Sequence, residues 1–373
     1  MIYEVTMNDS DYMRRAIELA KRARGFTNPN PMVGAVIVKD GRIIGEGYHE
    51  RCGELHAERN AFKNLTESAV GATIYVTLEP CCHYGKTPPC TEAIIENGIA
   101  KVVIGSRDPN PLVSGKGAKL LREHGIEVVE DFLREECDKL NPIFFHYITK
   151  KLPYVTLKYA MSADGKIATK TGESKWITGD EARQEVQYLR HESMAIMVGI
   201  GTVLSDDPML NVRIDGLKSP VRVICDSHLQ IPVDSKIVKT AKDIRTILAF
   251  AEPEDAGITE DFAAKKKALT DAGVELLSVG SGRVDLRELM LKLGEMGIDS
   301  VLVEGGGTLN DSLRAAGLVN RVYVYIAPKI IGGSGAKSPV SGEGIDRLSD
   351  ALLLKLVSVK QIGEDVRLEY SLR

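Results

Sequence analysis

The alternation of apolar and polar residues predicts a first series of strands and helices in the N-terminal part of the chain. Over residues 11–24 the apolar positions recur at helical spacing, and Gly25 follows as a stop signal. The runs "VGAVIV" (33–38) and "RIIGEGY" (42–48) flank Asp40-Gly41, a pattern typical of a β-hairpin. Further helices are predicted from His56, from about Pro89, near 117–124 and over 133–148, and further strands at 73–78, 101–105 and 126–130. This order predicts a parallel or mixed sheet between helical layers.

The pattern starts again after "TKKLP" (149–153), a polar stretch ending in Pro that we interpret as a linker. Strands are predicted at 154–160, 194–199, 221–225, 244–250, 274–277 and 300–304, helices near 180–192, 256–272, 285–296 and 307–316, and a β-rich end at 321–331, 352–362 and 366–372. A chain of 373 residues also exceeds the size that one hydrophobic core usually supports. We therefore predict two α/β domains, residues 1–148 and 149–373.

Composition narrows the class of protein. Hydrophobic residues make up 43% and charged residues 27%, as in an ordinary globular protein. No apolar run approaches the roughly 18 residues of a membrane span, so no membrane partner is expected. The N-terminal segment lacks an apolar signal core and six cysteines make no disulfide framework, which favours a cytoplasmic location. The net charge of −4 without a basic block argues against a nucleic-acid partner.

Two segments, "GELHAERNAF" (53–62) and "TLEPCCHYGKTPPC" (77–90), contain residue types that bind a metal. A catalytic zinc ion usually takes three protein ligands and leaves a fourth position for water. His56, Cys81 and Cys90 offer one imidazole and two thiolates. Glu58 lies near His56 at the predicted start of a helix, where a carboxylate can move protons between water and a departing amine. This is the chemistry of the zinc deaminases, whose signature is H-x-E followed by P-C-x-x-C.

Taken singly, these residues have simpler explanations. The cysteines could be buried small hydrophobic residues, and His56 could be a surface residue at a helix start. Each candidate ligand nevertheless stands at the end of an element, and a proline precedes both Cys81 and Cys90. The joint pattern favours a zinc site, with Cys82 as an alternative to Cys81.

The spacing of the cysteines indicates a particular group of deaminases. Eight residues separate Cys81 from Cys90, where the common signature has two. The segment closely resembles the motif P-C-x-H-x-G-K-T-P-P-C of the pyrimidine deaminase of bacterial riboflavin biosynthesis. That resemblance implies that Cys81 is the ligand, since Cys82 stands where this family commonly has Ser. It also implies substrate contacts, which fall on Asn30, His49, His83 and Lys86, the last two suited to a phosphate. Lys86 could equally be a solvated loop residue.

The second half contains a candidate anion site in "VLVEGGGTLNDSL" (301–313). Three glycines between an apolar strand and a helix expose backbone N–H groups beside a helix N-terminus, which suits a pyrophosphate. The segment is not a G-x-G-x-x-G fingerprint, and three glycines alone are often a plain loop.

The order of motifs in this half resembles the reductase domain of the same riboflavin pathway, whose fold is related to that of dihydrofolate reductase. With the first half, nearly the whole chain (about 10–370) resembles the bifunctional deaminase–reductase family. The implied fold class is α/β, with an N-terminal cytidine-deaminase-like three-layer domain and a C-terminal dihydrofolate-reductase-like domain. The implied substrate contacts are Ser174, Arg190, Leu210, Arg213 and Glu304, and the implied NADPH contacts are Ala160, Trp176, Thr202, Asp206, Ser227 and the loop 306–312 (Gly306, Gly307, Thr308, Leu309, Asn310, Asp311 and Ser312).

Several of these positions keep an alternative. Trp176 could be a core residue, Asp206-Asp207-Pro208 could be a plain turn, and Arg190 could be a solvated helix residue. Lys158 points into the same predicted pocket, and Lys158 and Asp206 are both candidates for the group that protonates the opening ribose.

The resemblance implies two reactions on a phosphorylated pyrimidine. Zinc-dependent hydrolysis would remove the C2 amine of 2,5-diamino-6-(5-phosphoribosylamino)pyrimidin-4(3H)-one, and NADPH would then reduce its ribosyl group to ribityl, giving 5-amino-6-(5-phosphoribitylamino)uracil. A homo-oligomer is expected. Two other classes compete with this one. A nucleoside or nucleic-acid deaminase conflicts with the cysteine spacing, and a zinc-stabilised interaction module leaves Glu58 without a purpose.

Overall fold

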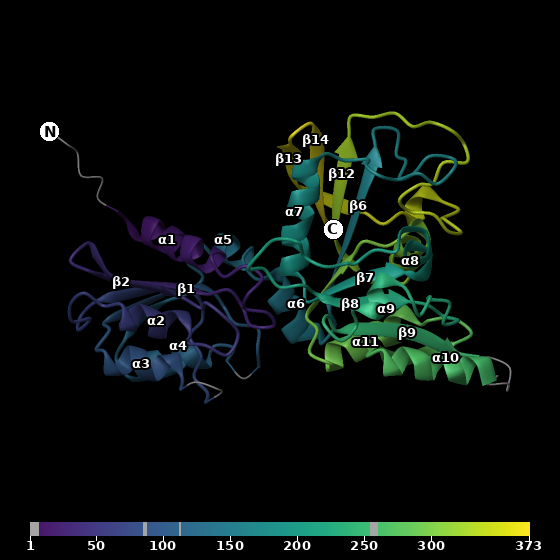
Figure 1. Ribbon diagram of the computed structural model, residues 1–373. Coiled ribbons are helices and arrows are strands. Elements are labelled where there is room, and N and C mark those ends of the chain that lie inside the picture. Colours follow the sequence, from purple (N-terminus) through teal and green to yellow (C-terminus); the bar gives the residue numbers. More distant parts are fainter. Residues whose placement is uncertain (1–6, 85–87, 112, 254–259) are drawn as a thin grey trace. The chain divides into compact units, whose positions relative to one another are not determined.

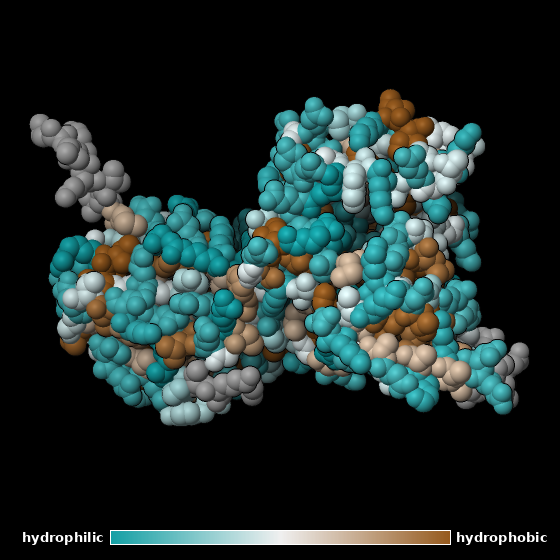
Figure 2. Space-filling view, viewed as in Figure 1, coloured by the Kyte–Doolittle hydropathy of each residue, from teal (hydrophilic) through white to brown (hydrophobic). Residues whose placement is uncertain are grey.

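The computed structural model describes residues 7–84, 88–111, 113–253 and 260–373. The chain forms two compact units that divide after Lys151 (Figure 1). The division that we expected after residue 148 falls inside helix α6 (Pro142–Lys150), so the helix continues to the boundary and the connection is shorter than "TKKLP". Within the described ranges, none of the helices combines the length and apolar character that a membrane crossing requires. On the face drawn in Figure 2, hydrophilic side chains predominate.

The first unit is a five-stranded mixed sheet with helices on both faces. Its order is β2-β1-β3-β4-β5, with β1 (Gly34–Lys39) antiparallel to β2 (Arg42–Tyr48) and to β3 (Thr73–Leu78), and with β4 (Lys101–Ser106) and β5 (Glu127–Val129) parallel to β3. Helix α1 (Asp9–Lys21) packs on one face, and α2 (Ala57–Lys63), α3 (Cys90–Glu96) and α4 (Lys116–Glu123) cover the other. Both candidate metal motifs lie at N-terminal ends of helices on that second face.

The single helix predicted over 133–148 is wrong. The segment forms α5 (Arg134–Asp138) and α6, which are separated at Leu140 and Asn141. Pro142 lacks an N–H and disfavours helical backbone in the residue before it, so it begins a helix rather than continuing one. The Asn141 side chain is used elsewhere, because it exchanges two hydrogen bonds with the backbone of Met32.

Helix α2 lies unusually close to the edge strand β2. A Cβ atom added at Gly47 would stand 2.3 Å from the backbone nitrogen of Ala61, so only glycine allows this approach. From this position the Asn60 and Asn64 amides donate to the carbonyls of Tyr48 and Glu46 at 2.8 and 2.9 Å. The backbone N–H of Thr66 donates to the carbonyl of Ile44 at 2.8 Å. Three alternate carbonyls of the edge strand are therefore satisfied within the unit, which disfavours edge-to-edge pairing.

The second unit contains a nine-stranded sheet of order β10-β9-β8-β7-β11-β6-β12-β14-β13. Seven strands are parallel: β6 (Tyr154–Ser162), β7 (Ala195–Gly199), β8 (Val221–Cys225), β9 (Thr246–Glu252), β10 (Glu275–Ser281), β11 (Ser300–Val303) and β12 (Val319–Ala327). The antiparallel hairpin of β13 (Leu354–Ile362) and β14 (Asp365–Leu372) extends one side. Strand β11 lies between β7 and β6, so its carboxyl end meets theirs.

Helices cover both faces of this sheet. Helices α11 (Leu286–Glu295) and α12 (Gly307–Ala315) pack on one face, and α7 (Asp180–Glu192), α8 (Ile200–Asp206), α9 (Lys236–Lys239) and α10 (Glu260–Asp271) lie on the other. The predicted strands and longer helices of this half are present. The short helices α8 and α9 were not predicted, because seven and four residues are too few to show a helical period.

Candidate active sites

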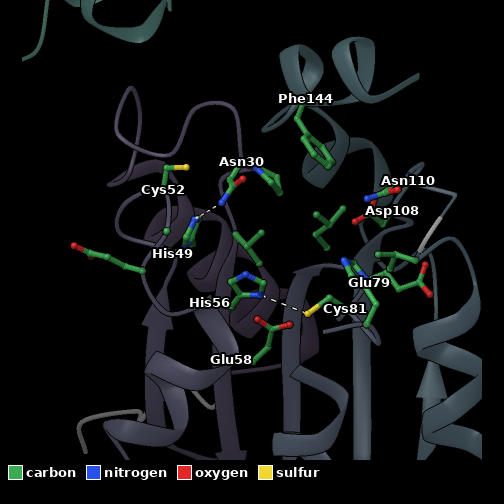
Figure 3. Close-up of a pocket in the computed structure, with 17 residues that line it drawn as sticks. Asn30, His49, Cys52, His56, Glu58, Glu79, Cys81, Asp108, Asn110 and Phe144 are labelled. Carbon is green, nitrogen blue, oxygen red and sulfur yellow. Dashed lines mark hydrogen bonds between the residues drawn. The ribbon is translucent and has the colours of Figure 1, made fainter. Parts of the chain in front are cut away.

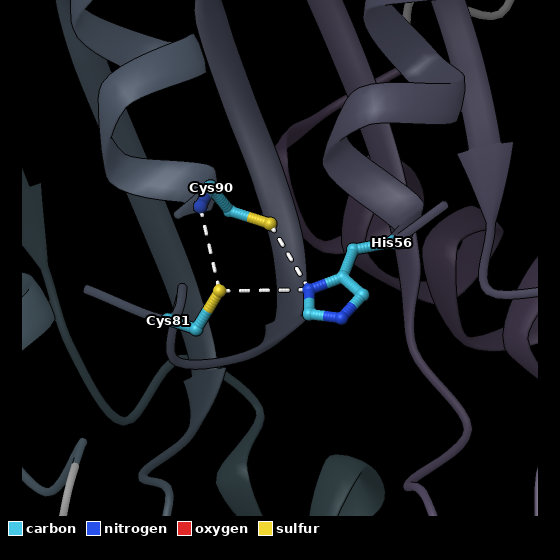
Figure 4. A group of neighbouring side chains, drawn as sticks. All are labelled: His56, Cys81 and Cys90. Carbon is cyan, nitrogen blue, oxygen red and sulfur yellow. Dashed lines mark hydrogen bonds between the residues drawn. The ribbon is translucent and has the colours of Figure 1, made fainter. Parts of the chain in front are cut away.

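His56, Cys81 and Cys90 meet where α2 and α3 begin (Figure 4). His56 is the N-cap of α2, Cys90 is the first residue of α3, and Cys81 follows β3. The Nδ1 atom of His56 lies 3.5 Å from the sulfur of Cys81 and 3.3 Å from that of Cys90. The three donor atoms all lie within 4.8 Å of one another. The three ligands predicted from the sequence thus lie together in one compact cluster.

The cluster has the chemistry of a catalytic zinc site. Zinc–nitrogen and zinc–sulfur bonds of about 2.0 and 2.3 Å in a tetrahedron place the donors roughly 3.5 Å apart, close to the distances observed. The backbone N–H of Cys90 also donates to the sulfur of Cys81 at 3.4 Å. Hydrogen bonding from Cys90 lowers the pKa of the Cys81 thiol to about 4, and the same contact raises the pKa of Cys90. One thiolate is therefore ready without a metal, and a cation would favour the second.

Cys82 lies outside this cluster. Among the described residues, the donor atoms that come within 4.8 Å of one another are those of His56, Cys81 and Cys90. Burial raises the pKa of the Cys82 thiol, which disfavours the thiolate that a metal needs. The geometry therefore favours Cys81 over Cys82.

Glu58 lies beside the cluster, on the first turn of α2, and its side chain points toward His56 and Cys81 in Figure 3. The residue is only 3% exposed. Burial raises the pKa of its carboxyl, with the neighbouring Cys81 acting in the same direction. A raised pKa makes the carboxyl hold a proton more readily, which suits a group that must both take and give one.

A cavity of about 310 Å³ opens in front of the cluster, and His56, Cys81 and Glu58 line it. The predicted substrate residues Asn30, His49 and His83 line the same cavity. Lys86 lies outside the described residues.

His49 and Asn30 have a defined arrangement in this cavity. The Nδ1 atom of His49 lies 3.0 Å from the Leu55 carbonyl, which can only accept, so Nδ1 carries the proton. Its Nε2 then accepts from the Asn30 amide at 3.2 Å. Burial lowers the pKa of His49, which keeps the ring neutral. The Asn30 side chain uses its amide nitrogen in this contact with His49, so its amide oxygen is available to a substrate.

Sequence reasoning missed further residues that line the cavity, among them Glu79, Asp108, Asn110 and Phe144. Asp108 is 7% exposed, and burial raises its pKa to about 6. It accepts from the Asn110 backbone at 2.8 Å. Glu79 instead has a structural function, because its carboxylate accepts three N–H groups at the start of α4. Asp108 follows β4, the parallel neighbour of β3, and Cys81 follows β3. Because parallel strands end at the same edge of a sheet, the position of Asp108 after its strand could have predicted that it lies near Cys81.

In the second unit, Arg190 and Glu304 form a two-pronged ion pair. The Nε and Nη2 atoms of Arg190 donate to the two carboxylate oxygens of Glu304 at 2.7 and 2.9 Å, and the side chains are 13% and 11% exposed. Arg190 is therefore not a solvated helix residue. Lys158 is electrostatically coupled to both, and burial lowers its pKa while Glu304 opposes that change. Burial disfavours the Glu304 carboxylate, but Arg190 and Lys158 hold its pKa below the usual value.

The segment 207–213 connects this pair to two other predicted residues. Its Asn211 carbonyl accepts from Arg190 at 2.9 Å, and the Arg213 N–H donates to the Gln187 side chain at 3.0 Å. Leu210 is buried with φ at +50°, and the Arg213 side chain is exposed. Asp206 is the last residue of α8 and Asp207 is its left-handed C-cap, so these residues form a helix end rather than a separate turn.

The predicted nicotinamide-cofactor loop 306–312 is helical from Gly307 onward, which corrects its description as a loop. Leu309 packs into the core, the Asn310 amide donates to the Pro339 carbonyl at 2.8 Å, and Asp311 pairs with Arg314 at 2.8 Å. Ser312 accepts from Arg283 at 3.0 Å, and Thr308 is exposed. These side chains are largely engaged within the protein, and Gly307 is itself buried against Ser338 and Ser341.

The start of α12 at Gly306 is the candidate anion site of this segment. Gly306 is the N-cap of α12, and its position lies near Thr202 of α8, whose hydroxyl oxygen would be 3.8 Å from an added Cβ atom. At Gly305 an added Cβ atom would stand 2.8 Å from the end of the Leu309 side chain and 3.3 Å from the backbone nitrogen of Gly199, so a larger residue would crowd this turn. Unpaired N–H groups at the start of a helix bind anions.

The remaining predicted contacts lie at the ends of neighbouring strands or in one long loop. Ala160 lies on β6 and packs against the α7 face, and the hydroxyl of Ser227, after β8, accepts from the Val284 N–H at 3.1 Å. Ser174 is half-buried. Trp176 is 59% exposed and stacks with Arg183 at 4.6 Å, so it is not a core residue.

Comparison with known proteins finds a family match for each of the two units. The model of the RibD C-terminal domain matches residues 153–368, and that of the cytidine and deoxycytidylate deaminase zinc-binding region matches residues 6–106. The riboflavin biosynthesis protein RibD of Actinobacillus pleuropneumoniae is 58% identical over 98% of this chain and 96% of its own length. That of Aquifex aeolicus is 44% identical over 98% of both chains.

Solved structures agree. Acinetobacter baumannii RibD has a TM-score of 0.85 at 40% identity, and a diaminohydroxyphosphoribosylaminopyrimidine deaminase/5-amino-6-(5-phosphoribosylamino)uracil reductase from Thermotoga maritima has 0.84 at 41%, each over 97% of this chain and 98% of its own. The predicted fold class, a cytidine-deaminase-like domain with a dihydrofolate-reductase-like domain, is confirmed. So is the expectation of zinc and NADPH as cofactors. The chain belongs to the RibD family, the bifunctional zinc-dependent deaminases and NADPH-dependent reductases of riboflavin biosynthesis.

Proposed function

We propose that the cavity of the first unit binds 2,5-diamino-6-(5-phosphoribosylamino)pyrimidin-4(3H)-one and removes its C2 amine as ammonia. The observation that carries this proposal is a buried Glu58 beside the His56, Cys81 and Cys90 cluster, at the floor of a cavity lined by polar groups. We assign the three cluster residues as zinc ligands. Zinc, when bound there, would make water nucleophilic at neutral pH.

Glu58 would act on protons at two atoms. Its carboxylate takes a proton from the attacking water, and the resulting carboxylic acid gives that proton to the C2 amine as it departs. Its raised pKa supports the second step, because burial makes the carboxyl hold the proton until the departing amine takes it. Asn30 and His49 would orient the pyrimidine ring, and His83, with Lys86, would receive the phosphate.

In the second unit, the proposed reaction reduces the ribosyl group to ribityl. The bond from C1 to the ring oxygen breaks, the ring oxygen takes a proton, and the exocyclic nitrogen forms a double bond to C1. NADPH supplies a hydride to C1. We assign the proton to Lys158, whose ammonium shares a buried site with Arg190 and Glu304. Asp206 is the alternative donor, and Ser174 and Leu210 would complete the substrate site.

A coupled assay of the purified chain tests this function. With the diamino substrate, ammonia release and NADPH oxidation should occur in equal amounts. We assign the exposed Arg213 side chain to the substrate phosphate. Arg213→Ala should raise the substrate KM of the reductase roughly 10- to 150-fold, because such a charge-assisted contact contributes about 1.5–3 kcal/mol. Its ammonia release should be unchanged. Ammonia release without NADPH oxidation by the unaltered chain would contradict the reductase assignment.

We also propose that each compact unit is a domain with its own activity, and that the chain is a homo-oligomer. All residues assigned to deamination precede the division after Lys151, and all those assigned to reduction follow it. Strand β13 is the edge of its sheet and exposes apolar side chains, including Leu356, Val357 and Val359 at 51–60%, which favours self-association.

Expressing the two units separately tests whether each has its own activity and which of them forms the homo-oligomer. Residues 1–151 should release ammonia, and residues 152–373 should oxidise NADPH with the deaminated substrate. In sedimentation, the second fragment should form the oligomer. A folded second fragment that reduces nothing until the first is added would show that the sites are shared, and a monomeric full-length chain would refute the oligomer.

A further inference from the structure

Tyr325 lies against the proposed proton donor on the α7 face of the nine-stranded sheet. Lys158 on β6 is in register with Tyr323 on β12, and Ala160 is in register with Tyr325, so Lys158 and Tyr325 share one face. The Lys158 ammonium nitrogen lies 5.5 Å from the centroid of the Tyr325 ring. Tyr325 is fully buried, and no reaction step described above uses it.

The ring of Tyr325 is held from its other end by charged groups. Its hydroxyl donates to the Glu185 carboxylate at 3.4 Å. Glu185, on α7, is paired in turn with Arg367 of β14 and with Lys360 of β13, the latter at 3.1 Å. The C-terminal hairpin and α7 thus fix the plane of an aromatic ring that faces the active-site ammonium.

An ammonium this close to an aromatic ring is stabilised by the negative charge of the ring face, most strongly where water is excluded. Among the described residues, the charged and titratable groups facing Lys158 include Glu304 after β11, Arg190 on α7, and Tyr323 and Tyr325 on β12. Glu185 on α7 lies at the Tyr325 hydroxyl. Burial and Arg190 both lower the pKa of Lys158, and Glu304 raises it. Glu304 is already engaged by both prongs of Arg190. The ring face of Tyr325 is therefore a further stabilising contact for a positive charge at this place.

We propose that Tyr325 is a positioning residue of the reductase, whose ring face keeps the Lys158 ammonium charged and aimed at the ring oxygen of the ribose. This inference rests on the proposed function of Lys158 as proton donor. Tyr325 touches no reacting atom, and it acts only through Lys158.

The test varies the charge of the ring face at constant shape in the full-length enzyme. Tyr325→Phe keeps the ring face and removes the hydroxyl, so kcat for NADPH oxidation should retain its dependence on pH. Placing 3,4,5-trifluorophenylalanine at position 325 keeps the ring, but its fluorine atoms withdraw electron density and so reduce the negative charge of the ring face. The neutral form of Lys158 cannot give a proton, so activity falls as pH rises through its pKa. Loss of cation stabilisation lowers that pKa, and the alkaline limb should move down by roughly 0.5–1.5 pH units.

Two controls separate the possible failures. Unchanged ammonia release and an unchanged unfolding temperature show that the fluorinated enzyme is folded, and an unchanged KM for NADPH shows that its cofactor site is intact. If Lys158→Met reduces substrate at the normal rate, the proposed function of Lys158 is wrong. A second outcome is that Lys158→Met is inactive while the fluorinated and Tyr325→Phe enzymes lose activity at the same alkaline pH. The assignment of Lys158 as proton donor would then hold, and the inference about Tyr325 would be overturned.

Discussion

Glu58→Gln should lower the rate of ammonia release by about 10²- to 10⁴-fold, the range that a general acid–base group contributes. The amide has nearly the shape of the buried carboxyl, so the packing at the start of α2 and the cavity should persist. It cannot take a proton from water or give one to the departing amine. The expected result is thus an enzyme that still binds the diamino substrate and deaminates it far more slowly.

The same preparation carries its own control. NADPH oxidation with the already deaminated substrate should continue at the normal rate, because Glu58 belongs to the first unit and the reductase residues to the second. Zinc content, measured by atomic emission, should stay near one ion per chain. Normal ammonia release by the Glu58→Gln enzyme would remove Glu58 from the mechanism.

Cys90→Ser should empty the metal site and abolish deamination altogether. Losing a group that merely hydrogen-bonds a metal ligand costs about 10- to 100-fold in affinity, and losing a thiolate ligand should cost more. Cys90 is fully buried at the first turn of α3, so no other side chain can move in without repacking that turn. Zinc per chain should fall well below one in the purified protein, and ammonia release should fall with it.

Cys82→Ser is the matched control, because it makes the same change eight residues away and next to a ligand. It should leave zinc content and ammonia release near normal, since Cys82 lies outside the cluster. The opposite pattern, in which Cys82→Ser loses zinc and Cys81→Ser keeps it, would show that the ligand assignment is wrong.

The candidate metal site could be predicted from the sequence because its residues mark the ends of elements. His56 caps α2 and Cys90 begins α3, so short motifs contain both the ligands and the local structure that orients them. Asp108 has no such motif in "SRDPNP". Its place follows from the parallel pairing of β3 with β4, which brings the residues after both strands to one edge of the sheet.

The reductase site could be predicted less fully from physical reasoning. Arg190 and Glu304 are separated by 114 residues, and their pairing depends on β11 lying between β7 and β6. Nothing local in the sequence specifies that strand order, so only the family resemblance placed the two residues together. The exposure of Trp176 was likewise undetermined, because a single aromatic residue in a polar loop shows no period.

The contact between α2 and β2 has a consequence for how natural variants of this enzyme would be interpreted. Helix α2 has seven residues, too few to be stable alone, and Asn60 and Asn64 fasten it to the edge strand. The same helix begins at His56 and carries Glu58. A variant at Asn64 would therefore disturb solubility and catalysis together, although Asn64 caps the end of the helix opposite to His56. In a genetic screen for riboflavin auxotrophs, such a position would score like a catalytic residue.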